Sequence, residues 1–101
     1  MPSCPVEIAL VLCGDRIKFL IVRDLLKGTK RFGELQKSLG ASQKVLTDHL
    51  RIMEEYNLIE RKVYTQIPPK VEYSLTDLGI NLKPLIEEMY KWGASYKANS
   101  K

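Results

Sequence analysis

Two amphipathic segments joined by a glycine constrain the fold of this chain more than any other feature. Residues 32–39 place Phe32, Leu35 and Leu39 at helical spacing, and Gly40 follows where a helix end favours a left-handed residue. The longer segment, residues 41–56, repeats apolar side chains along one helical face: Val45, Leu46, Leu50, Met53 and Tyr56. A short helix, a tight turn and a longer helix predict a helix-turn-helix over about residues 31–56.

The polar face of the longer segment carries side chains that can recognise bases. Ser42 is the expected N-cap, so the first helical turn would begin with Gln43 and Lys44. Glutamine can pair with adenine, lysine or arginine can donate to guanine O6 and N7, and a threonine methyl can contact a thymine methyl. Many polar helix faces are only solvated, and this remains the alternative. The residues expected to contact DNA from this helix are Ser42, Gln43, Lys44, Thr47 and Arg51.

The residues before this unit predict two further helices. Pro5 suits the first position of a helix, which makes Cys4 the N-cap of a short helix over residues 6–12. Asp15 can cap a second helix over residues 16–26. The apolar side chains of the second helix form a band broad enough for a mostly buried helix.

A β-hairpin is predicted over about residues 59–75. Apolar residues recur with period two on both sides of a proline-containing tip: Ile59, Val63, Val71, Tyr73 and Leu75. Such a hairpin is the wing of a winged helix. The basic residues expected to contact DNA phosphates lie on the wing and just before the helix-turn-helix: Lys30, Arg31, Lys62 and Lys70. Two prolines at the tip protect the edge from unwanted strand pairing, so stiffness alone could explain them.

The C-terminal segment, about residues 76–98, predicts a helix with a heptad seam. Its apolar residues are spaced alternately by four and three positions: Leu78, Leu82, Leu85, Met89, Trp92 and Tyr96. Pro84 lies inside the segment and should kink or split the helix. The seam could pack on its own domain or form a homodimer contact together with the first helix. The expected dimer interface comprises Val6, Leu82, Leu85, Met89 and Trp92.

Length and charge fit a single DNA-binding domain spanning residues 1–101. A chain of 101 residues is long enough for one modest core. The net charge of +4 lies entirely between Lys27 and Lys70, as a phosphate-facing surface requires, although random placement of a few lysines would give the same excess. The expected fold is mainly α with a small β-hairpin: a winged helix-turn-helix with N- and C-terminal dimerisation helices.

Several functional classes find no support in the sequence. No apolar run is long enough to span a membrane and the start lacks a secretion signal, so a cytoplasmic location is expected. Cys4 and Cys13 have no metal-ligand spacing, and no metal or cofactor is expected. His49, the single histidine, is interpreted as a packed boundary residue. Glutamates adjacent in sequence diverge around a helix and cannot act as a paired acid and base, so no enzyme is predicted.

Four strings of residues together resemble the HxlR-type transcriptional regulators. They are residues 30–35 (KRFGEL), 42–47 (SQKVLT), 71–79 (VEYSLTDLG) and 91–93 (KWG). The resemblance implies a homodimeric, MarR-like winged helix of bacteria or archaea that binds an operator near a promoter. The chain departs from the usual family pattern at residues 15–17, close to an expected subunit contact or ligand pocket, while a small-molecule or oxidant effector remains compatible with the family.

Cys4 falls on the N-terminal cysteine of the family, which implies a role in sensing electrophiles or oxidants. At the N-cap its sulfur would lie beside the positive end of the helix dipole, which favours a thiolate, whereas the charge of Glu7 opposes one. Cys13 lies about two helical turns away, so an intersubunit or mixed disulfide is expected rather than an intramolecular one. The alternative is an inert small residue.

These features predict a sequence-specific DNA-binding transcriptional regulator that binds a pseudo-palindromic operator as a homodimer and responds to electrophile or oxidative stress through Cys4. The alternative is a winged-helix protein-interaction module without base readout. Steep weakening of DNA binding by salt would separate the two, because only the first neutralises phosphates.

Overall fold

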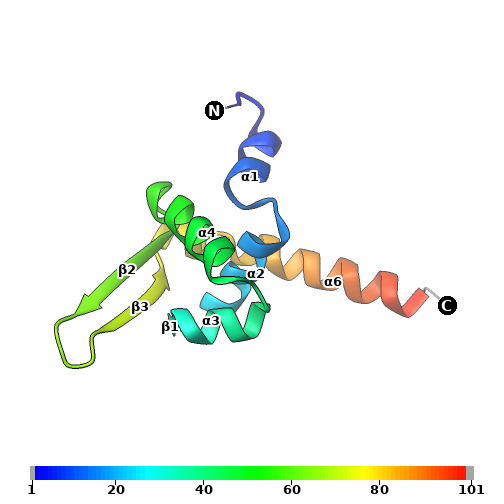
Figure 1. Cartoon of the computed structure of the whole chain (residues 1–101). Coiled ribbons are helices and arrows are strands. Elements are labelled where there is room, and N and C mark those ends of the chain that lie inside the picture. The colour runs from blue at the N-terminus through cyan, green and yellow to red at the C-terminus, as the bar shows by residue number, and fades with distance from the viewer. Residues whose placement is uncertain (1, 100–101) are drawn as a thin grey trace.

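The computed structural model describes residues 2–99, in which helices surround one edge of a small sheet (Figure 1). In chain order the elements are α1 (Pro5–Cys13), α2 (Arg16–Leu25), β1 (Lys30–Arg31), α3 (Phe32–Leu39), α4 (Gln43–Glu55), β2 (Ile59–Tyr64), β3 (Lys70–Leu75), α5 (Asp77–Ile80) and α6 (Lys83–Asn99). The fold is mainly helical with a small antiparallel sheet, as the sequence predicts.

Local signals set the boundaries of the helix-turn-helix. Gly40 ends α3 in the left-handed conformation, with φ of 60°. Ser42 then caps α4, because its Oγ accepts a hydrogen bond from the backbone N–H of Val45 at 3.2 Å. After α4, Asn57 takes a positive φ of 64° and turns the chain into β2. The two helices predicted for the helix-turn-helix are confirmed, with the left-handed Gly40 after the first and the Ser42 cap on the second.

The core joins α2, α3 and α4 to the base of the wing. Its buried side chains are Ile21, Val22, Leu25, Leu35, Leu39, Leu46, Leu50, Met53, Leu58, Ile59 and Tyr73. α3 and α4 contribute apolar residues spaced three or four apart, so each buries one stripe and leaves its polar side to solvent. α2 is covered more broadly and also buries Lys18 and Asp24. This packing fixes the orientation of α4, whose polar face points away from the core.

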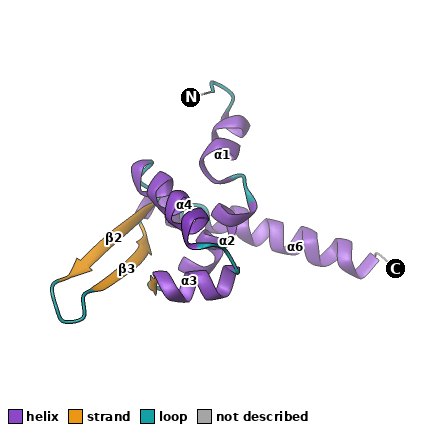
Figure 2. Ribbon diagram, in the orientation of Figure 1, coloured by secondary structure: helices purple, strands orange, loops and turns teal. Residues whose placement is uncertain are grey.

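The sheet has one strand more than the predicted hairpin. β2 and β3 form the wing (Figure 2), and their register pairs Arg61 with Tyr73 and Val63 with Val71. β1 pairs with the other edge of β3, so the strand order is β1-β3-β2. The sequence indicates residues 30–31 only as basic positions just before the helix-turn-helix. A strand of two residues has no alternation to detect, and only its pairing with β3 reveals it.

The C-terminal segment is split as the proline predicts. α5 ends at Ile80, and Pro84 lies in the first turn of α6, where its missing N–H removes no helical hydrogen bond. Thr76 anchors α5, because its Oγ1 donates to the carbonyl oxygen of Asn57 at 2.7 Å and accepts from the N–H of Gly79 at 3.0 Å. A Cβ on Gly79 would collide with the carbonyl oxygen of Leu58, so glycine permits this close approach.

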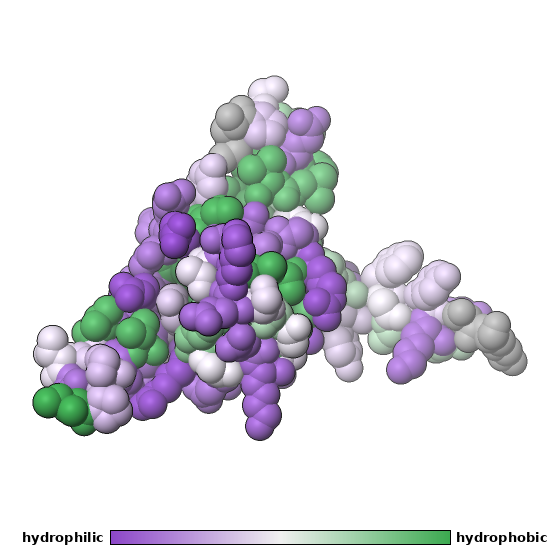
Figure 3. All heavy atoms as spheres, in the orientation of Figure 1, coloured by the Kyte–Doolittle hydropathy of each residue, from purple (hydrophilic) through white to green (hydrophobic). Residues whose placement is uncertain are grey.

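The first and last helices project from the core (Figure 1), and Figure 3 shows uncovered apolar side chains over α1. No described residue of α6 is buried, and α1 buries only Cys13. Val6 is 67% exposed and Trp92 is 70% exposed, and Trp92 stacks on Tyr96 with ring centroids 5.5 Å apart. Of the heptad seam, Leu82 packs against the core of its own chain. No helix among the described residues has the length and apolar character needed to cross a membrane.

Candidate nucleic-acid interface

The first turn of α4 presents the side chains predicted to read bases. Ser42, Gln43 and Lys44 are exposed, since the cap turns this end of the helix away from the core. The Lys44 Nζ lies 3.1 Å from the Asp48 Oδ2 one turn later. Both side chains are well exposed, so this ion pair is weak.

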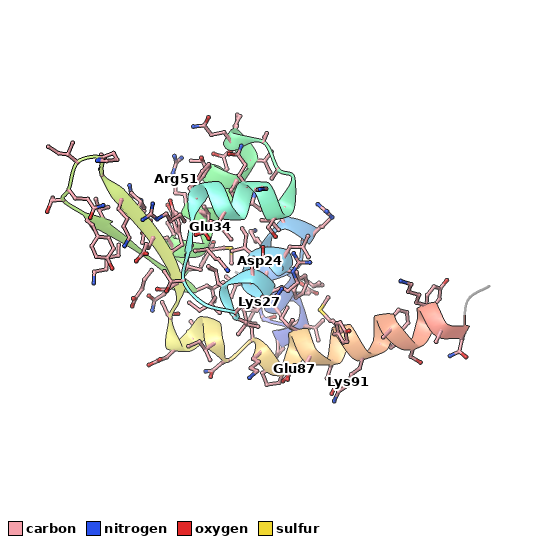
Figure 4. The ribbon with its side chains drawn as sticks, turned by 90° about the horizontal axis from the view of Figure 1, so that it is seen from below. Asp24, Lys27, Glu34, Arg51, Glu87 and Lys91 are labelled. Atoms are coloured by element: carbon pink, nitrogen blue, oxygen red, sulfur yellow. The ribbon has the colours of Figure 1, made fainter. Side chains whose placement is uncertain are left out.

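The second turn of α4 faces a recess between the helix and the wing. This helix–wing recess has a volume of about 290 Å³ and is lined by Thr47, Leu50, Arg51, Glu54, Arg61 and Tyr73. Figure 4 shows Arg51 on the side of the molecule from which the wing extends. Thr47 and Arg51, both predicted from the sequence, therefore share one site with an arginine of β2.

Arg61 is a basic residue that the sequence analysis did not single out. Arg61 pairs with Tyr73 in the sheet and follows Ile59 by two positions, so its side chain shares a sheet face with Ile59. This is the face that turns toward α4. The signal was present, because Arg61 is in phase with the apolar residues of its strand. Its meaning depends on the packing of α4 over that face, which no local pattern shows.

The other face of the wing gathers three basic residues. The Lys62 and Lys70 Nζ atoms lie 5.0 Å and 4.6 Å from the centroid of the Tyr64 ring. Arg31 pairs in register with Glu72, and the Lys70 Nζ is 3.3 Å from the Glu72 Oε2. Loss of hydration acts to raise the pKa of Glu72, but Tyr64, Lys70 and Arg31 outweigh it and lower that pKa. Glu72 therefore stays ionised among these cations.

The four predicted phosphate-binding residues do not form one group. Arg31, Lys62 and Lys70 share a sheet face, whereas Lys30 pairs in register with Tyr73 and lies on the opposite face. Lys30 instead lines a separate recess between α2 and α3. Consecutive residues of a strand point to opposite sides, and the missed strand β1 is the reason that Lys30 and Arg31 were grouped together.

His49 is a boundary residue that ties α4 to α2. Its Nδ1 lies 2.7 Å from the Val45 carbonyl oxygen and its Nε2 lies 3.4 Å from the Asp15 Oδ1. Asp15 also caps α2 by accepting from the N–H of Lys18 at 2.9 Å. Burial acts to raise the pKa of Asp15, but the hydrogen bonds from Lys18 and the charges of His49 and Lys18 lower it overall. An ionised Asp15 therefore connects the start of α2 to the middle of α4.

The two cysteines occupy contrasting environments. Cys4 is exposed at the N-cap of α1, whereas Cys13 is 1% exposed and its Sγ donates to the Ala9 carbonyl oxygen at 3.2 Å. Burial raises the pKa of the Cys13 thiol; Lys18 opposes this shift and Asp15 adds to it. The helix between them rises roughly 13 Å, far beyond the Cα separation of a disulfide, which is at most about 7 Å. Among residues 2–99 there is no cluster of three His, Cys, Asp or Glu side chains that could hold a metal ion.

Comparisons with known proteins agree with this geometry. The HTH-type transcriptional regulator YdeP of Bacillus subtilis (strain 168) is 45% identical over 96 residues, covering 94% of this chain and 75% of YdeP. The solved structure of the HTH-type transcriptional regulator ytcD superposes with a TM-score of 0.91 at 37% identity, covering 96% of this chain and 100% of ytcD.

A third similar protein is the redox regulator HypR in its oxidised form, with a TM-score of 0.86 and 41% identity over 91% of this chain and 96% of HypR. The model of the HxlR-like helix-turn-helix family matches residues 12–101. The fold and the relatives are those of transcriptional regulators. The chain therefore belongs to the HxlR-like helix-turn-helix family.

Proposed function

We propose that this protein is a sequence-specific regulator of transcription that binds a pseudo-palindromic operator as a homodimer. The observation that carries the proposal is the exposed polar face of α4, with Gln43 and Lys44 at its capped start and Thr47 and Arg51 beside the basic wing. The major groove of DNA admits a helix with this arrangement of donors. Because its proposed target is DNA, the proposed location of the protein is the cytoplasm.

The basic side chains divide into two roles. Gln43, Lys44, Thr47 and Arg51 contact base edges, because they lie on the outward face of α4. Arg31, Lys62 and Lys70 contact phosphates, because they gather on the wing rather than on the helix. We assign Arg61 to the phosphate that lies between helix and wing, since it shares a recess with Arg51.

Alanine substitutions should separate these roles. Lys44→Ala or Arg51→Ala should relax the preference at one base pair, at a cost of about 1–3 kcal/mol. Lys70→Ala or Arg61→Ala should weaken binding to all sequences alike and reduce the salt slope by about 0.9 for each lost phosphate contact. Binding of each variant to a randomised library and to the DNA flanking its own gene, at several salt concentrations, measures both quantities.

Lys97→Ala is the control for this experiment. It removes the same charge as the other substitutions, but from the exposed end of α6. Unchanged affinity and unchanged salt slope in Lys70→Ala and Arg61→Ala would contradict the wing assignment. A wild-type protein whose DNA binding does not respond to salt would instead favour the interaction-module function.

Exposed apolar surface supports the homodimer. Val6 on α1 and Leu85, Met89 and Trp92 on α6 are all exposed, on helices that project from the core. An uncovered apolar surface of this kind marks an interaction site. We propose that a second copy covers these residues together with Leu82. A two-fold axis would then set two α4 helices on half-sites about 10 bp apart or a multiple of that distance.

We further propose that Cys4 senses oxidants. It is the exposed thiol, it is the N-cap of the projecting helix α1, two residues before Val6, and the similar HypR is a redox regulator. Oxidation would join Cys4 to a partner thiol in a mixed or intersubunit disulfide, since Cys13 is buried at the other end of α1. A new link at this helix would shift the dimer and change the spacing of the two α4 helices.

Diamide treatment should therefore change operator affinity in the wild type and in Cys13→Ser, and leave Cys4→Ser unaffected. The measurement is operator affinity by mobility shift before and after treatment, with mass spectrometry to identify the modified thiol. Alkylation in the folded state should label Cys4 and spare Cys13, because burial keeps Cys13 protonated and covered. A loss of affinity that persists in Cys4→Ser would exclude Cys4 as the switch.

A further inference from the structure

A recess between α2 and α3 has no part in the DNA contacts proposed for α4. This α2–α3 recess has a volume of about 510 Å³ and is lined by Asp24, Lys27, Lys30, Glu34, Lys37 and Ser38. Figure 4 shows Asp24 and Lys27 on one side of α3 and Arg51 on the other. The recess therefore opens on a different side of the molecule from the helix–wing recess.

The carboxylates of the recess are already engaged. Asp24 is 5% exposed; its Oδ2 accepts from the Ser38 Oγ at 2.6 Å and its Oδ1 accepts from the Arg23 Nε at 2.9 Å. Glu34 accepts from the backbone N–H of Arg31 at 2.9 Å and so caps α3. Asp24 joins α2 to α3 and Glu34 caps α3, and within residues 2–99 neither pairs with a lysine of the recess.

The ammonium groups of the recess are free by comparison. Within residues 2–99, Lys27, Lys30 and Lys37 make no ion pair; Lys62, Lys83 and Lys97 make none either, but the first three share one recess. The three free lysines come from the end of α2, from β1 and from the last turn of α3, so they surround the recess from separate elements. A surface of this kind attracts a negatively charged partner.

The arrangement selects among anions. Asp24 is the buried acidic residue of the lining, so a compact phosphate pressed against it would meet a carboxylate whose charge the Arg23 guanidinium offsets only in part. Figure 4 shows Arg51 of α4 and Lys27 on different sides of α3, so DNA held by the outer face of α4 would lie away from Lys27. An extended segment with several carboxylates can instead cross the opening and reach each lysine in turn, without approaching the floor.

We propose that the α2–α3 recess is a docking surface for an acidic segment of another protein, used while α4 holds DNA. Lys27, Lys30 and Lys37 bind the carboxylates of that segment. The partner is distinct from the operator and from the second copy of the chain. Such a contact gives a regulator bound at its operator a way to recruit or obstruct a neighbouring protein.

The probe for this surface is a short polyglutamate peptide titrated into the full-length protein, with amide chemical shifts followed by NMR. We expect the shifts to concentrate in residues 24–38 and to persist when a non-specific DNA duplex saturates α4. Alanine at Lys27, Lys30 and Lys37 together should weaken the peptide about eightfold, taking about twofold for each exposed ion pair. Well-dispersed amide signals will show that the variant is folded.

The matched control replaces Lys83, Lys91 and Lys97 with alanine, which removes the same charge from α6. It should keep the wild-type affinity for the peptide. Equal losses in the two variants would reduce the interaction to net charge and overturn the proposal. Displacement of the peptide by the duplex would assign the lysines to DNA, and inorganic phosphate giving the same shifts at the same concentration would make the recess a simple anion site; either result overturns the proposal.

Discussion

Replacing both Leu85 and Met89 with aspartate is expected to convert the protein to a monomer and to lower operator affinity about 100-fold or more. Both side chains lie on the exposed apolar face of α6, with exposed fractions of 39% and 44%. Two carboxylates on each copy would have to be desolvated at the proposed interface, at a cost that the apolar contact cannot offset. In a monomer the two α4 helices are no longer linked, so each half-site of the operator is bound separately. The increase in affinity that comes from binding both half-sites at once is then lost.

The matched control places two aspartates on the same helix at the same spacing, at Ala94 and Ala98. These positions lie on the side of α6 opposite the seam, as do Glu87 and Lys91, which Figure 4 shows at the edge of α6 away from the core. The control should remain dimeric in sedimentation equilibrium and keep its operator affinity. A wild-type protein that sediments as a monomer at micromolar concentration would contradict the dimer itself, and loss of affinity without loss of the dimer would move the effect elsewhere.

Much of the fold follows from local sequence signals. The left-handed residues Gly40 and Asn57, the cap at Ser42 and the proline in α6 each act within one helical turn, so the sequence alone places the helix ends. The wing is predictable for a similar reason, because period two marks the side chains of each strand that share a face, whereas the register is seen only in the paired strands. The caps and left-handed residues set where the helices end, and the periods of the apolar residues set which face of each element is buried.

The parts that escape prediction depend on contacts between elements distant in sequence. β1 has two residues and becomes a strand only through β3. Arg61 gains its position because α4 packs over one face of the sheet. The α2–α3 recess depends on the hydrogen bond between Asp24 and Ser38, which joins two helices. Arg61 is in phase with the apolar residues of its strand, but no period or motif shows that α4 covers that face, and β1 and the recess leave no local signal. All three arrangements decide where charged side chains lie.

A substitution on the apolar face of α4 is expected to have a large effect on the free energy of unfolding. Leu46→Ala is expected to destabilise the protein by about 2–5 kcal/mol, because Leu46 is 0% exposed within the core shared by α2, α3 and α4 and alanine would leave a cavity. A small domain has about 5–15 kcal/mol of stability in all. Urea unfolding followed by circular dichroism measures the change, at one fixed protomer concentration since dimer formation adds to apparent stability.

Val45→Ala is the internal control, because Val45 is the preceding residue on α4 and is 39% exposed. It should cost less than about 1 kcal/mol, since little apolar surface returns to water. Operator affinity should follow the same order, because Leu46 holds α4 in the orientation that points Gln43, Lys44 and Arg51 outward, whereas Val45 does not. Equal destabilisation by the two substitutions would show that α4 is not anchored through its buried face. An intact operator affinity in a destabilised but folded Leu46→Ala protein would show that reading DNA does not depend on that anchor.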